Sequence, residues 1–497
     1  MMRISLAGLA IGLAAVLAVA SAEAPVEGVI LFPTEPSFGS NMHTHHNGKD
    51  MAAIGVNWAR VDFSWNGMES KARGQYNFEY EGMEDVLADY RAHDMRVLGM
   101  LAWQDYCGKF YPDPNTDEGF AAGVAGFARW AGACADHFKG RVDIWEIANE
   151  PEAFPVGNVN QPQRYTQLAR ATARAIRAAD PDAHVGALST AWMDRGFIST
   201  CLALGLLDDR TIDVLTFHGY HRANLMPESG LAEDVAWLRG MIRKHAPRGH
   251  KVIVVDSERG YAIVPFLQPK RWSSWRNFVY TEAEQAAYLA RHYLEEIHLG
   301  IEVSIWYKDM FGEVNFSLYR GGPGSALRPM GHVMRNLAKL LDTNPKQLAN
   351  HKYDVSLVDL PDQVPDPNAV VRVRSFLRTH LTADESVATE TLVIAMWNPV
   401  EAFNGRILDS RKRIEDDYYE AWRAISPDDV AEVPVQLTIG QLAQERVSKS
   451  QRHDLLATEA EAPRSAVKLT FSGKRATTET LNVGPFPTVV VLELDAE

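Results

Sequence analysis

Eight strand-like segments alternate with helix-like segments between residues 37 and 342, and this alternation restricts the possible folds more than any other feature. The expected strands cover residues 38–43, 55–63, 96–102, 142–150, 184–188, 212–218, 251–256 and 302–307. The expected helices cover residues 80–93, 117–138, 162–179, 231–245, 281–299 and 330–341. Residues Val252 to Val255 are apolar throughout, as expected of a parallel strand buried on both faces.

Regular alternation of strands and helices predicts an α/β protein built around a (β/α)8 barrel, the TIM barrel. The other arrangement of alternating elements is a doubly wound sheet. It is disfavoured because no Gly-x-Gly-x-x-Gly turn follows the first strand.

The pattern changes after about residue 345, where short strand-like runs replace the helical periodicity. These runs are separated by turns that contain Pro, Asp or Gly. We therefore expect a barrel over residues 37–342 and a C-terminal all-β, sandwich-like domain over residues 345–497. Charged residues 411–427 and 441–463 are expected to form surface excursions, and residues 28–32 to add a strand to the β domain.

The first 22 residues have the three parts of a secretory signal peptide. Arg3 supplies the positive charge, residues 4–20 form the apolar part, and residues 20–22 read Ala-Ser-Ala, a small-x-small cleavage site. We expect residues 1–22 to be removed and the mature protein to be secreted or periplasmic. No later stretch is apolar for long enough to cross a bilayer, so no membrane span is expected in the mature protein.

Charge and cysteine content exclude some partners. The net charge of −14 and the pI of about 5.6 argue against a nucleic-acid partner, because phosphate binding requires a basic surface. The three cysteines fit no zinc or redox motif. We expect a monomer.

In a barrel of this kind the functional residues lie at the C-terminal ends of the strands. The candidates are His43, Arg60, Trp103, Asn149, Glu150, His218, Tyr220, Glu258 and Trp306. Glu150 and Glu258 follow the fourth and seventh strands, which face each other across the barrel mouth. Cleavage of a glycosidic bond needs one carboxyl to protonate the leaving oxygen and one carboxylate to attack the anomeric carbon. Arg60 and His218 would keep one carboxylate ionised.

The sequence around these positions resembles the clan A glycoside hydrolases. The resemblance rests on Trp145-Glu-Ile-Ala-Asn149-Glu150-Pro151, Gly55-x-Asn-x-x-Arg60, His218-x-Tyr220, Glu258 and Trp306. Gly74-x-Tyr76-x-Phe78 and Ala178-Ala-Asp-Pro181 are most similar to family 39 and its exopolysaccharide-cleaving relatives.

The resemblance implies a retaining O-glycoside hydrolase that cleaves a polysaccharide or oligosaccharide, and the signal peptide implies that it is secreted. No cofactor is expected. In such an enzyme Glu150 would be the acid/base and Glu258 the nucleophile. Asn149 would bind the 2-hydroxyl of the sugar. Arg60, His43, Trp103, His218, Tyr220 and Trp306 would contribute to substrate binding.

Two features depart from the family pattern. The seventh strand ends in Asp256-Ser-Glu258, so Asp256 competes for the role of nucleophile; Glu258 is favoured because Asp256 lies nearer the packed part of the strand. His43, His45 and His46 suggest a metal site, but no partner motif accompanies them, and no metal is expected. The alternatives are a non-catalytic carbohydrate-binding barrel and a metal-dependent hydrolase that uses these histidines. The sequence specifies neither the sugar nor endo or exo action.

Overall fold

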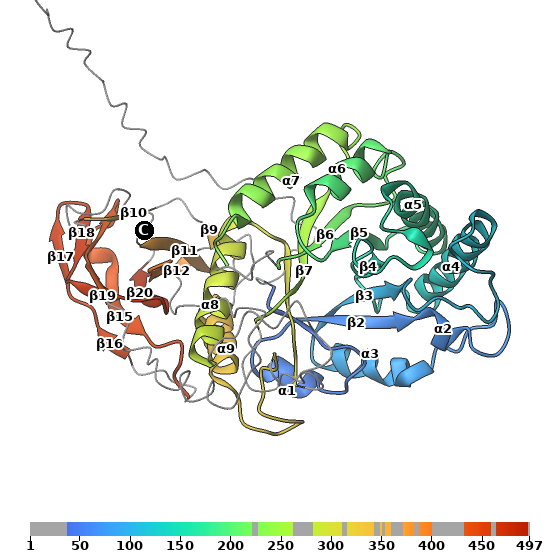
Figure 1. Cartoon of the computed structure of the whole chain (residues 1–497). Helices are drawn as coiled ribbons and strands as arrows, with labels where there is room; N and C mark the ends of the chain where they lie inside the picture. The colour runs from blue at the N-terminus through green and yellow to red at the C-terminus, as the bar shows by residue number, and fades with distance from the viewer. Residues whose placement is uncertain are drawn as a thin grey trace, which may run out of the picture.

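The first eight strands follow one another around a closed parallel sheet in the order β1 to β8, and Figure 1 labels β2 to β7 of this sheet. They are β1 (Gly39–Asn41), β2 (Trp58–Ser64), β3 (Arg96–Ala102), β4 (Ile144–Ile147), β5 (His184–Thr190), β6 (Val214–His218), β7 (Ile253–Arg259) and β8 (Val303–Trp306). Strand β1 pairs with both β2 and β8, which closes the barrel. The predicted (β/α)8 barrel is therefore confirmed.

The computed structural model describes residues 37–220, 227–261, 282–310, 316–341, 348–349, 353–358, 371–381, 387–399, 432–458 and 464–495. Residues 1–22, 28–32 and 411–427, for which a signal peptide, a strand and a surface excursion are expected, lie outside this set. No described helix is both long and apolar enough to cross a membrane. The three cysteines are buried thiols without a disulfide.

Polar residues replace apolar ones along the inside of the barrel. An enclosed apolar cluster is formed by Trp58, Leu98, Ile144, Val214, Ile253, Val255, Val303 and Ile305. Side chains two positions apart on a strand point to the same face. Two residues after Trp58, Ile144 and Val214, that face therefore carries Arg60, Glu146 and Thr216. This change sets the depth at which the site begins.

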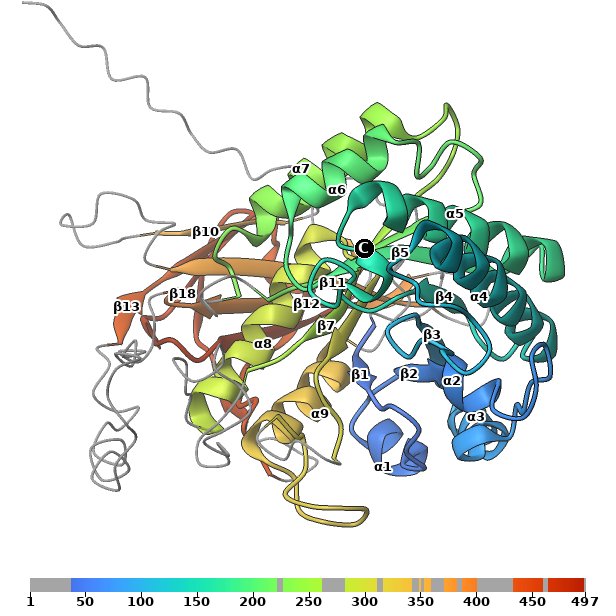
Figure 2. The ribbon, with the colours of Figure 1, turned by 45° about the vertical axis from the view of Figure 1, so that its right-hand side comes forward.

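Helices cover the outside of the barrel (Figure 2). They are α1 (Gly48–Ala53), α2 (Trp65–Met68), α3 (Met83–Ala92), α4 (Asp117–His137), α5 (Pro162–Ala179), α6 (Arg195–Ala203), α7 (Leu231–His245), α8 (Glu282–Leu299) and α9 (Pro329–Leu341). Helix α5 begins with Pro162 at its first position and buries one stripe from Tyr165 to Ile176, as its apolar spacing predicts. Helix α6 was not predicted because it is short, although Asp194 caps it by accepting a hydrogen bond from the Phe197 N–H at 3.0 Å.

The chain beyond α9 forms antiparallel sheets. The strands are β9 (Leu348–Ala349), β10 (Asp354–Leu357), β11 (Arg372–Leu381), β12 (Val387–Trp397), β13 (Val433–Val435), β14 (Leu437–Gly440), β15 (Val447–His453), β16 (Arg464–Ala466), β17 (Leu469–Ser472), β18 (Arg475–Thr478), β19 (Leu481–Val483) and β20 (Thr488–Asp495). One sheet has the order β16-β15-β20-β12-β11-β9 and another the order β10-β14-β18-β17. Residues from both sheets, such as Ile394 and Ile439, share one apolar core. The all-β, sandwich-like C-terminal region is thus confirmed.

One expectation for this region is wrong. Residues 441–463 were expected to form a charged surface excursion, but residues 447–453 are strand β15, which pairs with β16 and β20. The side chains of β15 are mostly polar and partly exposed, so the sequence lacks the apolar alternation that reveals a half-buried strand.

Buried charges join the barrel to the C-terminal sheets, with α8 and α9 lying between them (Figures 1 and 2). Glu228 accepts hydrogen bonds from Arg291 of α8 at 2.6 and 2.7 Å and from the indole of Trp397 of β12. All three side chains are buried. Because each charge is enclosed, loss of one partner would leave the other uncompensated.

Candidate active site

The end of β4 places Asn149 and Glu150 at the mouth of the barrel. Glu146 is the last inward-facing residue of the strand, and the chain then turns through left-handed conformations at Ala148 (φ 64°) and Glu150 (φ 45°). Such φ values are uncommon for residues other than glycine and often mark functional sites. The Glu150 N–H donates to the Ser189 carbonyl at 2.9 Å, which fixes this turn to β5.

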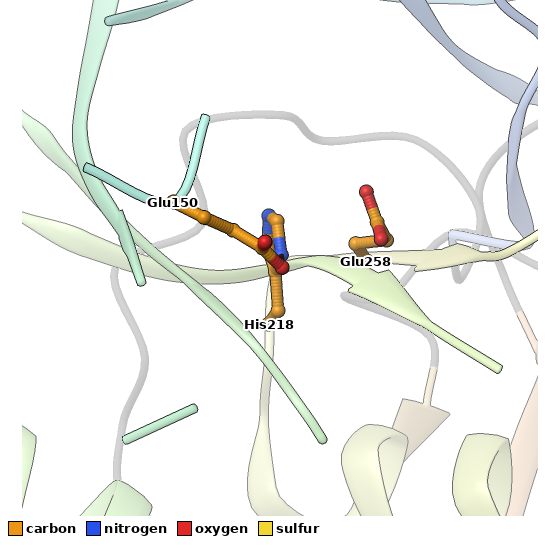
Figure 3. Close-up of side chains that lie close together, drawn as sticks. All are labelled: Glu150, His218 and Glu258. Carbon is orange, nitrogen blue, oxygen red and sulfur yellow. Dashed lines mark hydrogen bonds and ion pairs between the residues drawn. The ribbon is translucent and has the colours of Figure 1, made fainter. Parts of the chain in front are cut away.

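Glu258 lies on β7 beside His218 of β6. The pairing register of β6 and β7 shifts between Phe217 and His218, so that His218 is opposite Glu258. The side chains of Glu150, His218 and Glu258 lie close together (Figure 3). A carboxylate oxygen of each glutamate and a ring nitrogen of His218 lie within 4.8 Å of one another. The structure thus brings the two predicted carboxyl groups together.

Arg60 connects the groups around this pair. Its guanidinium donates to Glu146 at 2.9 Å, to the Asn149 side-chain oxygen at 2.6 Å and to Glu258 at 2.9 Å. Burial alone would lower the pKa of Arg60, but the Glu146 and Glu258 carboxylates outweigh it and raise the pKa. Arg60 is 1% exposed, so its cation is held inside the barrel by these partners.

His218 uses both ring nitrogens. Nδ1 lies 2.9 Å from Glu150 Oε1, and Nε2 lies 3.0 Å from the Ser189 hydroxyl. Burial alone would lower the pKa of His218, but the charge of Glu258 and the hydrogen bond to Glu150 raise it. A protonated His218 would donate a hydrogen bond to Glu150 and place a second cation beside the carboxyl pair.

Three donors surround Glu258. The Tyr220 hydroxyl donates to Oε1 at 3.2 Å, and Arg60 and the Asn41 amide donate to Oε2 at 2.9 and 3.4 Å. Burial raises the pKa of Glu258, while the His218 and Arg60 charges act against that rise. The donors leave Glu258 positioned at the mouth with its side chain 14% exposed.

Asp256 does not share this position. It is fully buried, and its Oδ1 accepts hydrogen bonds from the backbone N–H groups of Gly219 at 2.9 Å and Glu258 at 3.3 Å. On the other side it meets His292 and Glu296 of α8. Burial raises the pKa of Asp256 to about 6. Asp256 therefore orients the backbone of β6 and β7 and faces away from the mouth.

The remaining predicted residues lie in different surroundings. His43 is partly exposed and bonds Asp62 through Nδ1 at 2.6 Å. Trp103 is 1% exposed, stacks on Trp65 and donates to the Val156 carbonyl, and Trp306 is fully buried. Neither ring offers a free face for a sugar in this structure.

The histidines near residue 45 do not converge. His43 bonds Asp62, and His45 bonds Asp309 through Nδ1 at 2.9 Å. Among the described residues, the groups of side chains close enough to hold a metal ion do not include His43, His45 or His46. The arrangement gives no support to a metal site built from them.

Comparisons with known proteins agree with this geometry. Residues 20–256 match the family model of Cellulase (glycosyl hydrolase family 5), a span that contains Glu150 and ends two residues before Glu258. A comparison with curated protein sequences gave no match.

Solved structures share the fold at low sequence identity. A family 39 glycoside hydrolase from Bacteroides cellulosilyticus has a TM-score of 0.60 and 18% identity, over 93% of this chain and 81% of that chain. A glucosidase from Croceicoccus marinus has a TM-score of 0.55 and 14% identity, over 95% and 98%. A monomeric beta-xylosidase from Caulobacter crescentus has a TM-score of 0.52 and 15% identity, over 90% and 91%.

The closed barrel, with a carboxyl group at the ends of β4 and β7, and the family match confirm the resemblance to the clan A glycoside hydrolases that is seen in the sequence. The family 5 match covers just under half of the chain, and the neighbours in families 39 and 30 share its fold at low identity. This chain is therefore similar to the clan A glycoside hydrolases in its motifs and in its fold.

Proposed function

We propose that this protein is a retaining O-glycosidase in which Glu258 is the nucleophile and Glu150 the acid/base. The single observation that carries the proposal is the closeness of the two side chains, whose nearest oxygens lie within 4.8 Å. Retaining enzymes hold their two carboxyl groups about 5–5.5 Å apart, whereas inverting enzymes hold them about 6.5–9.5 Å apart to admit a water.

In the first step a Glu258 oxygen forms a bond to the anomeric carbon while the bond from that carbon to the leaving oxygen breaks. Glu150 gives its proton to the leaving oxygen, so the aglycone departs as an alcohol and Glu150 becomes a carboxylate. The Glu258 ester carries no charge, and Arg60 then balances Glu146 alone.

In the second step a water attacks the anomeric carbon from the side that the aglycone has left. Glu150 takes one proton from that water, the bond between the sugar and Glu258 breaks, and Glu258 becomes a carboxylate again. Two displacements at one carbon give net retention of configuration.

The charges around the pair suit this cycle. With His218 protonated, which its raised pKa favours, Glu146, Glu150 and Glu258 face two cations, Arg60 and His218, so one additional proton brings the group to zero charge. The donors on Glu258 are in place before the reaction and need no reorganisation. Arg60 holds the side-chain oxygen of Asn149, and no described residue bonds the amide N–H groups of Asn149, which can donate to a sugar hydroxyl.

A polysaccharide or oligosaccharide is the proposed substrate. Glucosidase, xylanase and xylosidase appear among the structural neighbours, which supports a sugar chain as the ligand. The test is a panel of aryl glycosides and polysaccharides in which released aryl group or reducing ends are measured. Wild-type protein should hydrolyse at least one member, and Glu258→Gln should abolish that hydrolysis.

Glu118→Gln, which changes an exposed glutamate on α4, is the matched control and should keep full activity. Binding of a polysaccharide without any release of reducing ends would favour the non-catalytic alternative instead. Full activity of Glu258→Gln would reject the assignment of the nucleophile.

We also propose that the protein is exported after removal of residues 1–22 and acts as a monomer. The charge, apolar run and small residues of this segment support export. N-terminal sequencing of protein recovered outside the cytoplasm should begin at Glu23, and light scattering should give the mass of one chain. An intact Met1 on that protein would contradict the proposal.

A further inference from the structure

Lys308 is a buried cation at the mouth of the barrel with no carboxylate bound to it among the described residues. It lies two residues after the end of β8 and is 4% exposed. Its contact with a side chain is with the ring of Tyr307, whose centroid lies 5.4 Å from Nζ.

This segment lies beside the nucleophile. The Tyr307 N–H donates to the Arg259 carbonyl at 2.6 Å, next in sequence to Glu258. The Asp309 N–H donates to the carbonyl of Asn41, whose amide bonds Glu258. The backbone on either side of Lys308 is therefore held to β7 and β1, and the Lys308 charge acts on His43 and on Asp62 of β2, two residues after Arg60.

The neighbouring carboxylates already have partners. Asp62 is bound to His43 at 2.6 Å, and Asp309 accepts hydrogen bonds from His45 and from the Asn47 amide at 2.7 Å. Burial alone would lower the pKa of His43, but Asp62 raises it, which favours a neutral His43–Asp62 ion pair. Among the described residues no carboxylate forms an ion pair with the Lys308 ammonium, although the Lys308 charge helps to lower the pKa of Asp62.

The geometry points to Lys308 as the binding group for a carboxylate on the substrate, so we propose that the sugar transferred to Glu258 is a uronic acid residue. Lysine offers a compact charge and three donors, which suit a carboxylate. A hydrogen bond between charged groups is stronger than one to a neutral hydroxyl, and enclosure strengthens it further. This inference rests on the proposed function and specifies its substrate class.

The test compares matched pairs of aryl glycosides that differ at one carbon: glucuronide with glucoside, galacturonide with galactoside, and mannuronide with mannoside, each in both anomers. The wild-type protein should prefer the uronide in at least one pair by about 10- to 100-fold in kcat/KM. Raising the ionic strength should increase KM for the uronide more than for the neutral glycoside.

Lys308→Met should lower that uronide preference by about 10- to 100-fold, while Lys308→Arg, which keeps the charge, should lower it less. Lys339→Met, an exposed lysine on α9, is the matched control and should keep the preference. Thermal unfolding of each variant establishes that it is folded before its kinetics are compared.

A protein that cleaves the neutral glycosides and shows no uronide preference would overturn this inference and leave the proposed function intact. The same holds if the folded Lys308→Met variant keeps the wild-type preference. Failure to cleave any member of the panel would instead overturn the proposed function, and this inference with it.

Discussion

Replacing Arg60 by methionine should cost both stability and activity, because Arg60 holds three groups at once. Methionine fills similar space but donates no hydrogen bond, so Glu146 would remain as a fully buried charge without its cation. Breaking a buried ion pair in this way costs about 3–5 kcal/mol. Glu258 loses one of its donors, and loss of one preorganised donor lowers kcat by about 100- to 1,000-fold.

The stability loss can be assigned to Glu146 by a double-mutant cycle measured by urea unfolding. Glu146→Gln in the Arg60→Met background removes the buried charge, so the double variant should be more stable than the sum of the two single losses by about 1–3 kcal/mol. Activity should not return, because Glu258 and Asn149 still lack Arg60. Additive stability losses, or recovery of activity, would refute this reasoning.

The pH dependence of the same variant follows from Glu146. In the wild type, burial would raise the pKa of Glu146, but Arg60 and His218 lower it below that of the unfolded chain. Glu146 then stabilises the folded state above its unfolded pKa, and this is lost as the pH falls through the folded pKa. Without Arg60 burial dominates and the sign reverses. The stability deficit of Arg60→Met should therefore be smaller at pH 5 than at pH 7.5, and a constant deficit would contradict the assignment.

Two further predictions concern stability. Burial raises the pKa of Glu152 to about 7, so the folded state keeps a proton between about pH 4.5 and 7 that the unfolded chain has lost, and stability falls as the pH rises through that window. Urea unfolding at pH 5 and 8 measures how far the free energy of unfolding falls between these two pH values. This fall should be smaller in Glu152→Gln than in the wild type by up to about 3 kcal/mol, and an equal fall in both proteins would contradict the prediction. Glu228→Ala should lower the free energy of unfolding by about 3–5 kcal/mol, because it leaves the buried Arg291 without its carboxylate and the Trp397 indole without its acceptor. The control Glu118→Ala, at an exposed site, should change it by no more than about 0.5 kcal/mol. Equal Tm values for the two variants would refute this prediction.

The barrel was predictable because its strands and helices carry strong, regular patterns. The expected helices over residues 162–179 and 231–245 agree with α5 and α7, where apolar spacing and end signals coincide. Strand β7 runs to Arg259, three residues beyond the expected end, because a register irregularity after Asp256 lets it continue. Such an irregularity depends on pairing with neighbouring strands, which a single sequence does not reveal.

The site was predictable where residues lie at strand ends and less so elsewhere. Glu150, Glu258, Arg60, His218, Asn149 and Tyr220 are brought into one network, as strand-end positions suggest. Glu146 was not proposed, although it lies two residues after an apolar inward position on β4. Asn41 was not proposed either. Lys308 draws attention because it is buried and has no ion pair with a carboxylate in the described part of the chain, which only the three-dimensional structure reveals.

The central claim is that Glu258 becomes covalently attached to the sugar. The probe is the 2-fluoro derivative of an activated aryl glycoside that the protein hydrolyses. Fluorine at carbon 2 slows both chemical steps, and a good leaving group keeps the first step faster than the second, so the covalent intermediate accumulates. Intact mass and peptide mapping should show one sugar on Glu258, released when excess acceptor is added, and no label on Glu258→Gln. The account would be contradicted if hydrolysis of the parent glycoside first gave the product with inverted anomeric configuration, or if the label were found on another residue.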